Sequence, residues 1–207
     1  AVALTDHGVM YGVVDFSRAC KAQGLNPIVG LETYISPRGM TDRDPQKDKT
    51  PSHLLLLAEN QVGYQNLLRI ATAAQLQGFY YKPRVDKPFL AEHAEGVIAL
   101  TSCNSGEIPR HILNGDVERA RQTATWYRDV FPGRFYIEIQ NHEGIPETEK
   151  LNRGLVALAR EMDIPLVATN DVHYVRAEDA EAQDILLCIQ TGKVQADPDR
   201  MRMTDSG

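Results

Sequence analysis

Short apolar runs alternate with segments of helical periodicity, and this alternation constrains the fold of the chain more than any other feature. Strands that alternate with helices are typical of α/β folds, so we expect a barrel or a distorted barrel. The uniformly apolar run 54–57 predicts a strand that is buried on both faces. The predicted strands are 1–4, 27–35, 54–58, 96–101, 134–140 and 164–168. The predicted helices are 10–20, 61–74, 88–93, 107–113, 117–130, 147–162 and 177–189.

Composition limits the class of protein and its compartment. With 207 residues, 43% of them hydrophobic, the chain is long enough for one domain with a sizeable core. A net charge of −6 argues against a free-standing nucleic-acid binder, so any contact with nucleic acid must be local or shared with other domains. Three widely spaced cysteines without a disulfide pattern indicate a reducing cytoplasm. No apolar run is long enough to cross a bilayer, and we expect no membrane partner.

Polar residues follow several predicted strands at the point where each strand ends. In α/β folds the chemistry collects at the carboxyl ends of the strands. In an extended chain residues i and i+2 point to the same side, so Asp171 and His173 could bind one ion or phosphate together. The strand-end residues are Asp6, His7, Cys103, His142, Asp171 and His173.

His53 lies at the start of its predicted strand, and therefore not at a carboxyl end, where functional residues collect in α/β folds. Only a loop, 36–52, separates this strand from the strand 27–35, which carries Glu32 in an apolar stretch. If the two strands run antiparallel, the start of one lies beside the end of the other. His53 would then join the same rim as Glu32.

Six of these residues form a candidate metal site. Three imidazoles, two carboxylates and one thiol suit zinc, manganese or iron, and the carboxylates suggest more than one ion, with Glu32 as a bridge. Two neighbouring metals are a common device for phosphate ester hydrolysis. The six are His7, Glu32, His53, Cys103, Asp171 and His173.

Each candidate also has an ordinary structural interpretation. Asp171 and His173 could form a polar turn, and His7 could be a turn residue. Glu32 could form a structural ion pair, Cys103 could be a small buried hydrophobe, and Asp6 is better explained as a hydrogen-bonding strut than as a ligand. In the aromatic and basic loop 78–84, Lys82 and Arg84 could hold a phosphate or be solvated. His142 is a second-tier candidate, while Cys20 and Cys188 lie on apolar helix faces and are expected in the core.

Five short segments that contain these candidate residues resemble, in order, the sequence motifs of the polymerase and histidinol phosphatase (PHP) superfamily. More narrowly, the chain is similar to the amino-terminal PHP domains of the alpha subunits of bacterial replicative DNA polymerase III. The segments 10–12, 63–67 and 78–84 carry that narrower resemblance. The five shared motifs are Thr5-Asp6-His7-Gly8, Gly30-Leu31-Glu32, Ser52-His53-Leu54, Ser102-Cys103-Asn104-Ser105-Gly106 and Asn170-Asp171-Val172-His173-Tyr174.

The resemblance implies a distorted seven-stranded (β/α)7 barrel with up to nine ligands around as many as three divalent metal ions. The six residues pooled above match six of those ligands. The other three, a His-x-His pair and an acidic residue, lie in the family on the first strand and the loop after it. We therefore expect that this chain is a fragment lacking that strand, that residues 1–190 form the PHP domain, and that 191–207 begin the connection to polymerase domains.

For function, the resemblance implies a metal-dependent 3′–5′ exonuclease within a DNA-directed DNA polymerase. Such a parent would use magnesium in its polymerase domain and would contact DNA, a proofreading exonuclease and a sliding clamp in the cytoplasm. The fragment alone is expected to bind metal weakly and to be inactive. Two alternatives stay open: a structural module that stabilises the polymerase and binds its proofreading partner, and a small-molecule phosphatase like histidinol phosphatase, which the loop 78–84 disfavours.

Overall fold

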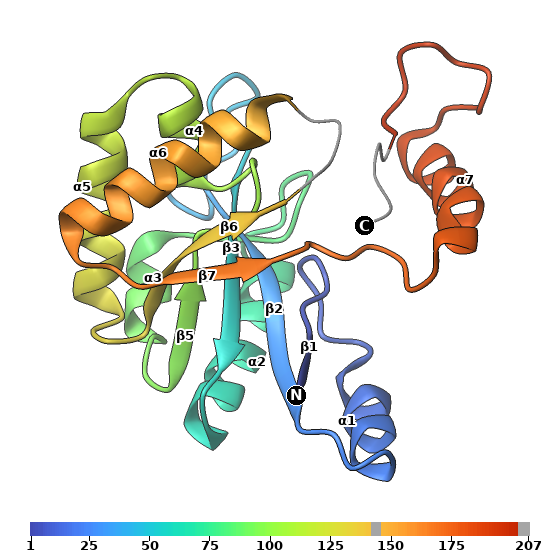
Figure 1. The fold of residues 1–207 in the computed structure, drawn as a ribbon, viewed down its shortest axis with the longest axis horizontal. Coiled ribbons are helices and arrows are strands. Elements are labelled where there is room, and N and C mark those ends of the chain that lie inside the picture. The colour runs from blue at the N-terminus through green and yellow to red at the C-terminus, as the bar shows by residue number, and fades with distance from the viewer. Residues whose placement is uncertain (142–145, 203–207) are drawn as a thin grey trace.

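The computed structural model describes residues 1–141 and 146–202, and its elements follow the predicted alternation of strands and helices (Figure 1). One strand was missed, β4, because a pair of residues carries no readable periodicity. The strands are β1 (Val2–Leu4), β2 (Pro27–Ile35), β3 (Ser52–Ala58), β4 (Arg84–Val85), β5 (Val97–Leu100), β6 (Phe135–Gln140) and β7 (Leu166–Thr169). The helices are α1 (Val13–Ala22), α2 (Gln61–Leu76), α3 (Lys87–Glu92), α4 (Glu107–Leu113), α5 (Val117–Val130), α6 (Pro146–Met162) and α7 (Ala180–Thr191), the last preceded by a 3₁₀ turn, Ala177–Asp179.

The strands form one sheet in the order β1-β2-β3-β5-β6-β7, with β4 paired to β2. β3 is antiparallel to both of its neighbours, and the other pairs are parallel. The carboxyl ends of the parallel strands therefore share one rim with the amino end of β3. This confirms the arrangement expected for His53, whose backbone is in register with Tyr34 near the end of β2.

The two faces of the sheet differ in what covers them. Leu54 and Leu56 of β3 are buried in the core cluster, which also contains Leu67 and Ile70 of α2. Their neighbours Leu55 and Leu57 are half-buried and line a pocket of about 540 Å³ on the inner face. The prediction that this strand is buried on both faces was therefore wrong, because its second face lines an open pocket.

The predicted α/β class is confirmed, and the sheet is curled and open. β1 and β7 are its two edges, and no pairing joins them within the described residues. The pocket lies on the inner face of this curl and is bordered by residues of both edges, Ala3 and Leu4 from β1 and Val167 and Thr169 from β7. Because β1 and β7 are not paired with each other in the described part of the chain, the closed barrel stays a prediction.

Helix α7 stands away from the sheet in Figure 1. Leu187 and Cys188 are its buried residues, whereas Ile189 is 71% exposed. Cys20 on α1 is also buried, so both cysteines expected in the core are buried. Among the described residues, no helix is long and apolar enough to traverse a bilayer.

Candidate metal centre

His7, Glu32 and His53 bring one ligand atom each to within 4.8 Å of the others. Glu32 lies in the middle, because its two carboxylate oxygens lie 2.6 Å from His53 Nδ1 and 3.4 Å from His7 Nδ1. The Glu32 side chain is 6% exposed, against 19% for His53 and 42% for His7. The three side chains thus form a carboxylate and imidazole cluster that opens to solvent on the His7 side.

Backbone pairing holds this cluster together. The turn after β1 is hydrogen-bonded to β2 on both sides of Glu32: the Glu32 N–H donates to the Asp6 carbonyl, and the Gly8 N–H donates to the Glu32 carbonyl. His53 is held from the other side, since its N–H donates to the carbonyl of Ser105. Each side chain is therefore fixed by main-chain contacts as well as by its neighbours.

Cys103 lies beside His53, with its Sγ 3.8 Å from His53 Nδ1. It sits in the turn after β5, where Ser102 adopts a φ of +63°, uncommon for a residue other than glycine. The Ser102 hydroxyl donates to Glu32 Oε1 over 3.1 Å. The turn thus adds a thiol to the rim of the cluster and a hydrogen bond to its carboxylate.

Asp171 and His173 approach from the opposite edge of the sheet, after β7. The His173 ring centroid lies 5.7 Å from that of His7. His173 Nδ1 donates to the backbone carbonyl of Asp171 over 2.7 Å, so a neutral ring presents the lone pair of Nε2. Both residues line the inner pocket together with His7 and Glu32, which places them at the same site.

The electrostatics differ among the three central groups. Burial lowers the pKa of His7, with the His53 and His173 rings acting in the same direction against Glu32. Burial alone would raise the pKa of Glu32, but the hydrogen bond from His53 and the charge of the neighbouring imidazoles lower it. Burial opposes protonation of His53 as well, yet hydrogen bonds to Cys103 and Glu32 raise its pKa to about 9. A metal ion would therefore meet an ionised Glu32 and a neutral His7, and would have to displace a proton from His53.

The donor set fits divalent metal ions. Within the described part of the chain, the buried carboxylate of Glu32 has imidazole and hydroxyl partners but no ammonium or guanidinium partner. Nitrogen, oxygen and sulfur donors in one cluster suit zinc, manganese or iron. The structure therefore gathers His7, Glu32 and His53 into one cluster and places Cys103, Asp171 and His173 next to it, although the role of all six in binding metal stays a prediction.

The second-tier candidates separate into different environments. Asp6 lines the pocket, and its backbone carbonyl accepts a hydrogen bond from the Glu32 N–H, while the role of its side chain stays a prediction. Lys82 lies near the centre, with its ammonium 5.5 Å from the ring centroid of Tyr34. His142 lies outside the described residues.

Arg84 corrects a prediction. It was expected either to hold a phosphate or to be solvated, but it is fully buried. Its guanidinium donates to the backbone carbonyls of Gly78, Asp48, Met40 and Asp42, and therefore ties the loop 36–52 to the loop 78–84. Since Arg84 is fully buried and all three guanidinium nitrogens donate to backbone carbonyls, Arg84 is not placed to bind a phosphate.

Two residues of the site were missed. Glu138 of β6 is buried and accepts hydrogen bonds from the Ser102 N–H, the Gln140 amide and the Thr169 hydroxyl, while burial raises its pKa. Tyr34 of β2 packs its ring against His53, with centroids 5.0 Å apart, and burial raises its pKa to about 12. The signal for Glu138 was available: like Glu32, it is a charged residue in an otherwise apolar strand.

Comparison with known proteins adds independent information. A family model described as the PHP domain matches residues 1–142. DNA polymerase III subunit alpha of Treponema pallidum is 45% identical over 204 residues, and that of Thermus aquaticus is 46% identical over 204 residues. In both cases the match covers 98% of this chain and 17% of the relative, so the chain spans about a sixth of their length.

Among solved structures, a protein from Bifidobacterium adolescentis that is provisionally described as a metal-dependent phosphoesterase matches 100% of this chain and 83% of its own. Its sequence identity is 14% and its TM-score is 0.38, a likeness too distant to carry an argument.

Proposed function

Because the chain belongs to the PHP domain family, we propose that it is the metal-dependent phosphoesterase domain of a bacterial replicative DNA polymerase and removes nucleotides from a DNA 3′ end. The observation that carries the proposal is the buried carboxylate of Glu32, held between the imidazoles of His7 and His53, with no lysine or arginine partner among the residues that the structure describes. Such a carboxylate is a site for a cation supplied from outside the chain.

In this proposal the six residues at the rim would hold the metal ions, up to three of them in the intact protein, with Glu32 as the central carboxylate. Zinc, manganese and iron are the candidates. When bound, these ions supply positive charge for a phosphate and acidify water.

The chain's own residues shape the rest of the site. Leu55 lines the pocket wall, and Tyr34 packs against the His53 ring. Ser102 and His53 orient the Glu32 carboxylate, and the Asp171 carbonyl holds His173 in the tautomer that presents Nε2. A pocket of about 540 Å³ has room for a terminal nucleotide that enters from the rim.

The parent protein in this proposal is a DNA-directed DNA polymerase of the alpha-subunit type, with DNA, a proofreading exonuclease and a sliding clamp as partners in the cytoplasm. The domain ends near residue 190, and 191–207 begin the connection to the polymerase domains. Similarity along 98% of the chain to named alpha subunits supports this assignment.

The test uses the intact polymerase that carries this chain. Asp171→Asn and His173→Ala are expected to lower the metal content and to reduce hydrolysis of a single-stranded 3′ end at least about 100-fold. His111→Ala, an imidazole deletion on α4 outside the pocket, serves as the matched control, and DNA synthesis by every variant reports on folding.

Unchanged hydrolysis in both ligand variants would overturn the catalytic proposal and would favour a structural module. Hydrolysis of histidinol phosphate but not of a DNA end would favour a small-molecule phosphatase.

A further inference from the structure

The loop 78–84 presents exposed aromatic rings and lysines next to the metal centre. Tyr81 is 58% exposed and Phe79 is 51% exposed, although large aromatic side chains usually bury most of their surface. The ammonium of Lys49, from the loop 36–52, lies 5.5 Å from the centroid of the Tyr81 ring. We call Lys49, Phe79, Tyr81 and Lys82 the aromatic and basic rim.

Tyr81 is held in an unusual conformation at the tip of this loop. Its φ is +58°, a region that costs a residue other than glycine of the order of 1 kcal/mol. The Tyr80 N–H donates to the Lys82 carbonyl across the tip, and the Tyr80 and Tyr81 rings meet edge to face with centroids 4.7 Å apart. The surrounding structure thus maintains an exposed ring in a strained backbone position.

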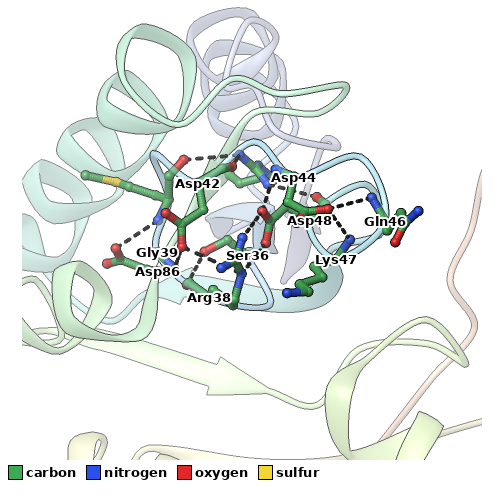
Figure 2. Close-up of polar contacts among 11 residues, drawn as sticks. Ser36, Arg38, Gly39, Asp42, Asp44, Gln46, Lys47, Asp48 and Asp86 are labelled. Atoms are coloured by element: carbon green, nitrogen blue, oxygen red, sulfur yellow. Dashed lines mark hydrogen bonds and ion pairs between the residues drawn. The ribbon is translucent and has the colours of Figure 1, made fainter.

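The base of the rim is rigid. Arg84 anchors the loop 78–84 through its four backbone acceptors, and its guanidinium lies 5.1 Å from the centroid of the Tyr80 ring. On the side of Lys49, the loop 36–52 is fixed by Asp48, which accepts two hydrogen bonds from Arg38 and one from the Asp44 N–H (Figure 2). Hydrogen bonds within the protein therefore hold both loops that carry the rim, 78–84 and 36–52, in place without a ligand.

One aromatic ring separates the rim from the candidate metal centre. Lys82 lies over Tyr34, whose ring in turn contacts that of His53. Pro83 packs against the turn that carries His7, since a Cβ on Gly8 would lie 2.6 Å from Pro83 Cγ. A ligand lying along Tyr81 and Lys82 would therefore reach the pocket at its His7 and His53 side.

The charge of the rim is opposite to that of the whole chain. The chain carries a net charge of −6, yet within its described part neither Lys49 nor Lys82 forms an ion pair, and both ammonium groups lie over aromatic rings. Ammonium groups without a carboxylate partner are available to phosphates. The rim is thus a local basic surface on an acidic protein.

We propose that the aromatic and basic rim binds single-stranded DNA and guides its 3′ end into the pocket, with a base stacked on Tyr81 and flanking phosphates on Lys82 and Lys49. The inference rests on the proposed function for the direction of the strand. Stacking on an exposed ring requires an unpaired base, and single-strand binders combine such rings with cations along the backbone. Duplex DNA does not offer free base faces, so the occupant is a single strand.

Binding is tested separately from hydrolysis, with the full 207-residue chain in excess chelator and a 5′-fluorescein-labelled dodecamer of thymidylate followed by anisotropy. Tyr81→Ala is expected to weaken binding about fivefold or more, whereas Tyr81→Phe keeps the affinity of the unmodified chain. With a dodecamer that is abasic at every position, the unmodified chain should bind no better than Tyr81→Ala, because no base remains to stack.

Lys82→Met is expected to weaken binding to both oligonucleotides and to reduce the slope of log K against log salt by about 0.7, the loss of one phosphate contact. Lys150→Met, which removes an exposed lysine from α6, is the charge control and should change neither quantity. Circular dichroism melting of each variant checks that the loop substitutions leave the fold intact.

No binding by the unmodified chain, or undiminished binding by both Tyr81→Ala and Lys82→Met, would overturn the inference while leaving hydrolysis by the intact polymerase as a separate question. If these variants lose binding and the intact polymerase shows no hydrolysis, the result would count against the proposed function but would support binding of single-stranded DNA by the rim.

Discussion

Two buried carboxylates, Glu32 in β2 and Asp48 in the loop that follows, are neutralised in different ways. Asp48 accepts two hydrogen bonds from the Arg38 guanidinium, at 2.9 and 2.6 Å, and a third from a backbone N–H (Figure 2). Glu32 has His53 at 2.6 Å, His7 at 3.4 Å and the Ser102 hydroxyl at 3.1 Å. Asp48 therefore has a permanent cation as its partner, whereas the imidazole partners of Glu32 can give up their protons.

This difference separates a structural carboxylate from one suited to a metal. A guanidinium stays charged at every physiological pH, so the positive charge of Arg38 balances the negative charge of Asp48. The hydrogen bond from Arg38 lowers the pKa of Asp48 to about 2. Imidazoles bind a metal only when neutral, and a metal that replaces their protons restores the positive charge beside Glu32. Burial alone does not distinguish the two carboxylates, whereas the identity of their partners does.

The largest expected effect is a loss of stability when the loop that contains Asp48 loses its contacts with Arg84. Arg84→Met leaves buried backbone carbonyls at Gly78 and Asp48 without donors, so the free energy of unfolding should fall by about 3 kcal/mol. Urea unfolding followed by circular dichroism measures the loss. Arg43→Met, an exposed arginine in the same loop as Asp48, should change stability by no more than about 0.5 kcal/mol. Equal stability of the two variants would show that the Arg84 contacts do not support the loop.

The next effect concerns metal affinity. In the intact protein, Glu32→Gln should weaken zinc or manganese binding at least about 100-fold, because it removes the charge between His7 and His53. Asp48→Asn is the matched variant and should leave metal affinity unchanged while lowering stability more than Glu32→Gln does. Competition with a chelating dye measures affinity, and urea unfolding measures stability. A loss of affinity in Asp48→Asn equal to that in Glu32→Gln would remove the distinction between the two carboxylates.

A smaller effect is expected from pH. The pKa of His53 rises from 6.5 to about 9 on folding, so its protonation adds stability that is fully present below pH 6.5 and is lost as pH rises through 9. The Asp48 contribution behaves oppositely: it is present above pH 3.8 and is lost as pH falls through about 2. Thermal melting in excess chelator should therefore show a midpoint that is lower at about pH 9.5 than at about pH 6.

His53→Gln is the control for this pH dependence and should flatten it over the same interval, whereas Asp48→Asn should leave it in place. A midpoint that does not fall in the unmodified chain would contradict the assignment of a protonated His53 beside Glu32.

Much of the site followed from sequence because its signals are local. Histidines and carboxylates next to strand ends are visible in the residue pattern, and the antiparallel course of β3 placed His53 at the same rim as Glu32. Glu138 was missed although it carries the same signal as Glu32. Tyr34 was missed because an aromatic residue in a strand ordinarily packs in the hydrophobic core. Only its contact with His53 identifies it as part of the site.

The sequence by itself determined the order and type of the elements other than β4 and the donor atoms of the candidate centre, because periodicity, turn residues and side-chain chemistry are properties of short segments. Tertiary structure alone decided which charged groups meet. It buried Arg84 against carbonyls of the distant loop 36–52, paired Asp48 with Arg38 and left Glu32 to histidines from two other segments. Burial and partnership depend on contacts between segments far apart in the chain, and these contacts determine whether a charge supports the fold or is available to bind a ligand.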